Sequence, residues 1–351
     1  MITQTAGHLL QDHVTLDLEC IDRLYLNAYQ PRLQTGGGVV SFFKQHRGAQ
    51  VASTTLMAPM SRAFVKAIRQ FARDEGVALE RFKRGVRKWL ARLHEALADW
   101  ETAAIERLLS EPVLHADETS LRIDRQQHWL HSVSAGNLVL KRCHRKRGTE
   151  ALRDIDIVPR YGGVLVHDRW ASYFAFEHCE HALCGSHLLR NLAFIEDAHG
   201  HAWARRMGHL LLTTCRTVRK HPNKALSETD YKAVRTRYRT LLTQAKRELP
   251  KPAKRLTGRR GRVAQCDARN LHDALVKYET EVLRFARDPD VPFTNHRAER
   301  DIRMAKVKQK VSGCFRTATC ADAWCRISSY LQSMTRQGYN PLTAIEIALK
   351  G

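Results

Sequence analysis

The spacing of hydrophobic and polar positions divides the chain into a short first section and a longer second one. Residues 1–88 contain a predicted strand, VVSFF, after a glycine run, and a helical pattern, SRAFVKAIRQFARDEG, with Phe64, Ile68 and Phe71 at helical spacing. We expect a small α/β section here, whose function its residues do not indicate. The next segment, WLARLHEALADWETAAIERLLS, predicts a helix that ends before Pro112.

Short apolar runs predict a set of strands between residues 113 and 168. VLHAD (113–117) continues into TSLRID, and HWLHSVS and LVLKRCH follow after turn residues. The segment TEALRDI predicts a short helix, and VLVHD (164–168) a fourth strand. A strand meander, a helix and a further apolar strand together predict an α/β domain.

After about residue 185 the pattern becomes helical. SHLLRNLAFIEDA, WARRMGHLLLTTCRTVRKH and YKAVRTRYRTLLTQAKRELP have apolar positions at a period of 3.6, as do NHRAERDIRMAKVKQKV and AWCRISSYLQSMTRQG near the end. Between them PKPAKRLTGRRGR (250–262) predicts a basic loop without acidic residues. This loop is either a solvated linker or a contact to a DNA backbone through Lys254, Arg255, Arg259, Arg260 and Arg262.

The charge balance adds a candidate partner. Lys and Arg number 58 against 36 Asp and Glu, a formal net charge of +22. Such an excess suits a polyphosphate, although an RNA-binding or ribosomal protein, or merely a basic surface, would show it too. No signal peptide and no apolar run of about 18 residues is found, so we expect no membrane span. Nine cysteines without a CxxC pair indicate a reducing cytoplasm rather than a disulfide framework.

Three acidic residues are candidates for chemistry. Asp117 and Asp168 each end an apolar strand, where an acid commonly just marks the exit of the chain to solvent. Two such ends in one sheet can also bring two carboxylates together, and a hard divalent cation would relieve their repulsion. Asn295, Glu299 and Arg303 lie at i, i+4 and i+8 of a predicted helix, which alone reads as an exposed face with ion pairs.

Four segments carry a resemblance to a known family. PVLHADETSLRID, YGGVLVHDRWASY, HALCGSHLLRNL and FTNHRAERDIRMAKVKQKVSGCF resemble, in order, the catalytic domain of insertion-sequence family 66 of bacterial transposases. The resemblance runs from about Asp99 to the C-terminus. It implies a ribonuclease H-like α/β fold over 89–351, a mixed sheet with a large, mainly helical insertion at about 190–285. It also assigns Asp117, Asp168 and Glu299 as the DDE catalytic and metal-binding triad.

The resemblance implies a mechanism and partners as well. Two Mg²⁺ or Mn²⁺ ions held by the triad would support hydrolysis at the ends of the element and transfer of the freed 3′-OH to target DNA. Further expectations are an oligomer on DNA and companion proteins of the element. Phosphate contacts are expected from residues near the triad: Arg169, His187, Arg190, Asn295, Arg297, Arg300, Arg303, Lys306, Lys308 and Lys310.

A cluster of Cys and His residues admits two interpretations. Cys184 and His187 stand near His178, Cys179 and His181, at spacings that zinc ligands can have. The favoured interpretation is a buried cysteine and a histidine that orients a neighbour in the site or contacts phosphate, and zinc is not expected.

The first section departs from the family. Residues 1–88 do not share the resemblance, and the family's longer N-terminal region with its zinc module has no counterpart in them. We therefore expect a fusion or a rearranged copy joined near RFKRGVRKWL. Two other functions stay open: a catalytically inactive DNA-binding remnant of a transposase, and a simple Mg²⁺-dependent nuclease.

Overall fold

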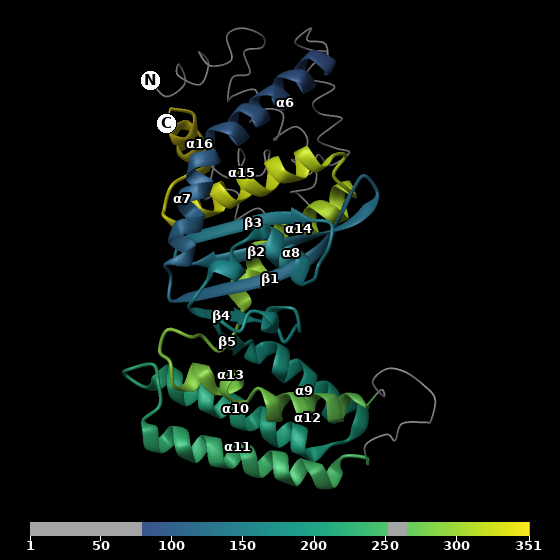
Figure 1. Cartoon of the computed structure of the whole chain (residues 1–351), viewed down its shortest axis with the longest axis vertical. Helices are drawn as coiled ribbons and strands as arrows, with labels where there is room; N and C mark the ends of the chain where they lie inside the picture. The colour runs from purple at the N-terminus through teal and green to yellow at the C-terminus, as the bar shows by residue number, and fades with distance from the viewer. Residues whose placement is uncertain (1–78, 252–264, 351) are drawn as a thin grey trace, which may run out of the picture. The chain divides into compact units, whose positions relative to one another are not determined.

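The computed structural model describes residues 79–251 and 265–350, which form two compact units (Figure 1). Of the described residues, the first unit contains 79–108, Glu118–Ile155 and 300–350, and the second contains Leu109–Asp117, 156–251 and 265–299. The five strands are hydrogen-bonded in the order β3-β2-β1-β4-β5. Strand β1 (Val113–Ile123) and helix α14 (His296–Ser312) each begin in the second unit and end in the first.

Parallel strands form the sheet of the second unit. The first half of β1 pairs with β4 (Val164–His167), and β4 pairs with β5 (Glu180–Leu183). All four residues of β4 are buried, which fits its continuous apolar sequence, since a parallel strand covered on both faces needs no polar alternation.

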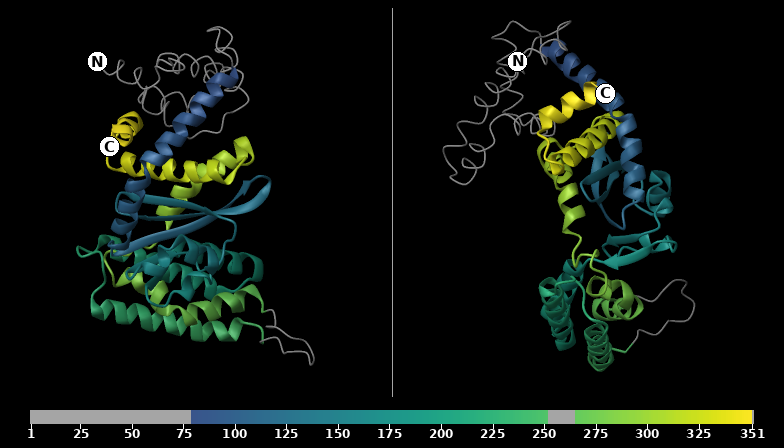
Figure 2. Two further views of the ribbon diagram at one scale, coloured as in Figure 1. Left: turned by 45° about the horizontal axis from the view of Figure 1, so that its top comes forward. Right: turned by 90° about the vertical axis from the view of Figure 1, so that its left-hand side faces the viewer.

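Helices bury one large core in the second unit. Helices α9 (Gly185–His199), α10 (Ala202–Lys220) and α11 (Glu228–Glu248) follow β5, and Figures 1 and 2 show α10 and α11 side by side. Trp203 and Tyr238 are fully buried in this core. The unit is completed by α12 (Asp267–Lys277), α13 (Glu279–Leu283) and the short 3₁₀ turns Val158–Arg160, Tyr173–Ala175 and Arg284–Ala286.

The first unit contains the antiparallel part of the sheet. Strand β1 turns into β2 (Gln126–Ala135) at Asp124 and Arg125, which both have the positive φ that a tight hairpin requires. Strand β2 pairs antiparallel with β3 (Leu138–His144). The helices of this unit are α6 (Leu79–Ala96), α7 (Ala98–Leu109), α8 (Thr149–Ile155), α15 (Ala318–Arg336) and α16 (Pro341–Lys350).

Helix α15 packs on β3 through small hydroxyl side chains. The backbone N–H groups of Val139 and Lys141 donate to Ser333 Oγ and Ser329 Oγ, each over 2.9 Å. These serines satisfy the N–H groups that the outer edge of β3 presents, so the helix closes that edge to further strands.

The structure confirms the predicted α/β class and most of the predicted elements. The helix expected over 89–110 is divided at Leu97 into α6 and α7. Four elements were not predicted: β5, α12, α13 and α16. VVSFF, SRAFVKAIRQFARDEG and most of the basic loop lie outside the described residues. Across 79–251 and 265–350, no helix has the length and apolar character that a membrane crossing requires.

Candidate active site

Candidate polar residues follow the stretch over which three neighbouring strands of the second unit pair in parallel; β1 continues to Ile123, so Asp117 lies within that strand and does not end it as expected. The register pairs His115 of β1 with Val166 of β4, and His167 of β4 with Leu183 of β5. Continued by one or two residues, the same register sets Asp117 beside Asp168 and Asp168 beside Cys184. Adjacent strands are about 4.8 Å apart, so this continued register would align the three side chains in one row where the parallel pairing ends.

A pocket opens beside this row. Its volume is about 320 Å³, at the lower end of roughly 300–1,000 Å³ for ligand pockets. The side chain of Asp168 is half-buried, and its Oδ1 accepts a hydrogen bond of 3.0 Å from the Trp170 backbone N–H. That bond fixes the carboxylate at the mouth of the pocket. The lining residues are Asp168, Arg169, Trp170, Leu183, Cys184, His187, Leu188 and Asn191.

Helix α9 starts directly after Cys184, and Gly185 makes this start possible. The backbone N–H of Gly185 donates to Phe293 O over 2.7 Å, and a Cβ at Gly185 would lie 2.3 Å from the Phe293 ring. Only a glycine admits this close approach. The turn from β5 into α9 therefore lies directly against the segment before α14, and the first turns of α9 carry His187 and Arg190.

Asn295 ties the start of α14 to the end of β1. Its side chain is 1% exposed. Its Nδ2 donates to Ala116 O over 2.7 Å, and its Oδ1 lies 2.9 Å from His115 Nδ1. Its backbone N–H donates to Cys184 Sγ over 3.1 Å. One buried residue thus connects β1, the β5–α9 turn and α14 within the second unit.

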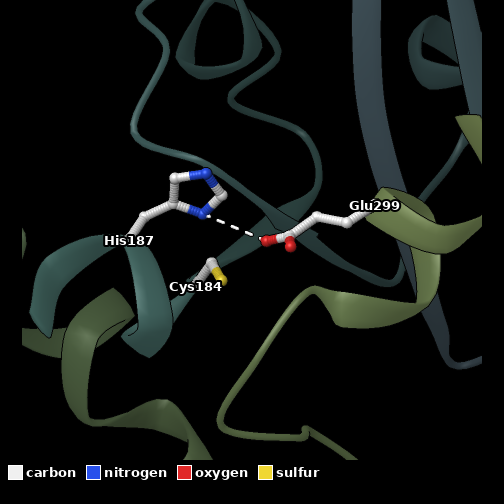
Figure 3. Close-up of side chains that lie close together, drawn as sticks. All are labelled: Cys184, His187 and Glu299. Atoms are coloured by element: carbon white, nitrogen blue, oxygen red, sulfur yellow. Dashed lines mark ion pairs between the residues drawn. The ribbon is translucent and has the colours of Figure 1, made fainter. Parts of the chain in front are cut away.

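Glu299 lies one helical turn further along α14, and its carboxylate faces the start of α9 (Figure 3). Glu299 Oε1 is 3.5 Å from His187 Nδ1 and 3.6 Å from Arg190 Nη2. These are ion-pair distances, but neither Glu299 Oε1 nor His187 Nδ1 makes a hydrogen bond, although both atoms are buried. One ligand atom each from Cys184, His187 and Glu299 lies within 4.8 Å of the other two.

The thiol and the imidazole of this group influence each other's protonation. Burial raises the pKa of Cys184, but contacts from His187, Ser186 and the Asn295 backbone outweigh it, and the net pKa is lowered. Contact with Cys184 raises the pKa of His187 against the opposing effect of burial. Both shifts favour a thiolate beside an imidazolium.

Two other histidines, on β4 and β5, contact each other and are not part of the group formed by Cys184, His187 and Glu299. The Nε2 of His167 is 3.1 Å from His181 Nδ1, and His181 Nε2 is 3.2 Å from Phe176 O. Burial lowers the pKa of His167 to about 3, so this ring is neutral at physiological pH. Among the residues that the structure describes, only Cys184, His187 and Glu299 meet as three metal-binding side chains, so the wider ligand set considered from the sequence does not form.

The predicted DNA-contacting residues have different positions. Arg169 lines the pocket, and Arg190, 63% exposed, pairs with Glu299. Arg297 is half-buried with partners in the fold, and Lys308 lies 3.7 Å over the Phe315 ring. Exposed positions on α14 belong to Arg300, Arg303, Lys306 and Lys310. The basic residues Lys254, Arg255, Arg259, Arg260 and Arg262 lie outside the described residues.

Asn295 differs from its predicted role. Both ends of its amide are bonded to the end of β1, so it has no free group for a phosphate. The sequence analysis missed this structural role of Asn295, and it also missed the packing of Phe293 on Gly185. For Asn295, the sequence FTN directly before the helix was a signal of a structural role, since Asn is a preferred residue at the N-terminal cap of a helix.

Comparison with known proteins agrees with the resemblance read from the motifs. No curated protein matches the chain. A family model described as "Transposase IS66 family" matches residues 43–323, a range that includes all three candidate acids. The match begins inside the first section, so the expectation that all of residues 1–88 lie outside the family, with a join near RFKRGVRKWL, is wrong for residues 43–88. The match covers well over half of the 351 residues. The chain therefore belongs to the IS66 family of transposases, enzymes that cut and transfer DNA.

Proposed function

We propose that this protein cleaves the ends of a DNA element and joins them to target DNA in a reaction that requires Mg²⁺ or Mn²⁺. Asp117, Asp168 and Glu299 would be its catalytic acids, on a ribonuclease H-like sheet interrupted by the helices at about 190–285. The observation that carries the proposal is the strand register of the second unit: the two aspartates are 51 positions apart, which equals the offset between β1 and β4.

The donor atoms fit a hard divalent cation. Carboxylate oxygens are the ligands that Mg²⁺ prefers, and such an ion would activate a water or 3′-OH and stabilise the leaving oxygen. Glu299 Oε1 is a buried carboxylate atom without a hydrogen bond, and its nearest ion-pair partners are 3.5 and 3.6 Å away, so a bound cation would give it a closer partner. Asp117 and Glu299 are the last residues of the second unit in β1 and α14, so all three acids lie in one unit.

Basic side chains of the same unit would bind the DNA backbone. Arg169 lines the pocket with Asp168, and Arg190 is exposed one turn after His187. Both can stabilise negative charge on a phosphate, which is the principal contribution of protein side chains to phosphoryl transfer. The exposed basic positions of α14 and the basic loop would extend this contact. We further propose that the protein acts as an oligomer on DNA in the cytoplasm, with companion proteins of the element.

The proposal is tested with purified protein, Mg²⁺ or Mn²⁺ and labelled DNA from the ends of the element. Asp117→Ala, Asp168→Ala and Glu299→Ala should each lower cleavage by at least about 100-fold. Asp197→Ala, an exposed acid on α9, is the matched control and should cleave normally.

Other outcomes would identify the alternatives. Binding of DNA without cleavage in any divalent metal would indicate an inactive remnant. Cleavage without joining of the 3′ end would indicate a nuclease. Full cleavage by the three alanine variants would refute the assignment of the acids.

A further inference from the structure

A thiol, an imidazole and a carboxylate meet at the start of α9, in a combination that the Mg²⁺ reaction does not explain. Oxygen ligands serve Mg²⁺, whereas thiolate and imidazole select softer cations such as Zn²⁺. Cys184, His187 and Glu299 each present one such atom, and all lie within 4.8 Å of one another.

From this geometry we propose that Cys184, His187 and Glu299 form a binding site for a soft divalent cation of the Zn²⁺ class, and that occupancy of this site inhibits cleavage by capturing Glu299. The ligand set differs from the one considered from the sequence, because Glu299 replaces Cys179, His178 and His181.

The distances suit a tetrahedral zinc site with one open position. Bond lengths of about 2.0–2.1 Å to nitrogen and 2.0–2.2 Å to oxygen set those two atoms about 3.4 Å apart. The observed distance from His187 Nδ1 to Glu299 Oε1 is 3.5 Å. In such a site the Cys184 sulfur would lie about 3.6 Å from the nitrogen and from the oxygen. The three ligand atoms already lie within 4.8 Å of one another, so a movement of the sulfur by about 1 Å suffices.

Unsatisfied atoms provide an independent indication. His187 Nδ1 and Glu299 Oε1 are buried, close together and without hydrogen bonds. A cation between them would satisfy both. The thiol is also prepared for binding, since its contacts lower its pKa toward the thiolate form that a metal requires. His187 must lose its proton to bind, so binding should weaken as the pH falls.

Rigid neighbours hold the ligands in place. Cys184 Sγ accepts the Asn295 N–H, and Glu299 N–H donates to Asn295 O over 3.2 Å. Asn295 therefore fixes the sulfur and the start of the glutamate-bearing helix relative to each other. The inhibitory part of the proposal rests on the proposed function, because it requires Glu299 for cleavage, but cation binding does not depend on it.

The first test uses Co²⁺ alone as a probe on the full chain, without DNA or Mg²⁺. Wild-type protein should show the near-ultraviolet charge-transfer absorption of a thiolate–cobalt bond. Cys184→Ser should abolish it, and His187→Gln and Glu299→Gln should weaken cobalt binding at least tenfold. The matched control is the double variant Cys266→Ser, Cys320→Ser, which removes two exposed thiols and should keep the absorption.

The site is refuted if wild-type protein shows no such absorption, or if folded Cys184→Ser, checked by circular dichroism, retains it. The second test adds Zn²⁺ to the Mg²⁺-supported cleavage reaction and compares wild type and Cys184→Ser, each with and without Zn²⁺. Zn²⁺ should inhibit wild type at least tenfold more strongly than Cys184→Ser. Equal inhibition of both would refute the inhibitory role. Absence of cleavage in wild type would count against the proposed function and leave the cobalt result intact.

Discussion

Asn295 provides the sharpest test of how the candidate site is assembled. Its buried amide donates to Ala116 O and accepts from His115 Nδ1, both next to Asp117 on β1. Asn295→Ala removes both bonds, and with them the Asn295 partner of two buried polar atoms, His115 Nδ1 and Ala116 O. Each lost bond to a buried atom costs about 1–3 kcal/mol, so the free energy of unfolding should fall by about 2–6 kcal/mol.

A second variant separates this effect from the loss of packing. Asn295→Leu keeps the number and branching of the side-chain heavy atoms but also removes both bonds, so it should lose a similar free energy. The matched control is Asn270→Ala in the same unit, where an exposed amide donates to Gln265 O over 3.2 Å. Substitutions at such surface positions usually change stability by less than about 0.5 kcal/mol.

The measurement is urea denaturation followed by circular dichroism, together with cleavage of DNA by the folded variants. Since the Asn295 side chain ties the start of the Glu299-bearing helix α14 to β1, both variants should cleave more slowly even where they are fully folded. A loss of less than 0.5 kcal/mol for Asn295→Ala, equal to that of the control, would refute the argument that this amide holds the site together.

Three further changes have expected outcomes in denaturation experiments. Gly185→Ala forces a Cβ into the Phe293 ring and should lower the free energy of unfolding by about 1–3 kcal/mol. Gly208→Ala, inside α10, places a Cβ only against Leu189 at 3.7 Å and should raise the free energy of unfolding by about 0.5–1 kcal/mol. The reverse order of stabilities would contradict the packing. Glu101 is buried between Arg326 and Arg142, so Glu101→Ala should lower the free energy of unfolding by about 3–5 kcal/mol. The control Glu228→Ala breaks an exposed pair with Lys232 and should cost at most about 0.5 kcal/mol. A similar loss of stability in both variants would be inconsistent with the buried network. Burial lowers the pKa of His131 from 6.5 to about 4, so between these pH values the unfolded chain binds a proton that the folded chain does not. The free energy of unfolding should therefore fall as the pH is lowered from 6.5 toward 4, by up to about 1.4 kcal/mol per pH unit. His131→Phe should reduce this slope, and an unchanged slope would show that His131 does not cause it.

Local sequence determined most of the elements of this protein. The bounds of TEALRDI coincide with those of α8, and the apolar run before Asp168 is β4, because helix and strand preferences depend on a few neighbouring residues. Strand β5 could not be predicted in this way. Its four residues, Glu180–Leu183, include an acid and a histidine, and they are extended because they pair with β4.

The motifs also indicated which acids to examine, but not how they meet. From the sequence, the separation of 51 positions between Asp117 and Asp168 is only a spacing; in the structure it equals the offset of the parallel pairing of β1 with β4. Asn295 and Glu299 looked alike on a helical wheel, yet one is buried against β1 and the other faces His187 and Arg190. Residues more than a hundred positions apart come together through packing, which has no signature in the spacing of side chains along one element, so the tertiary structure alone decided these contacts.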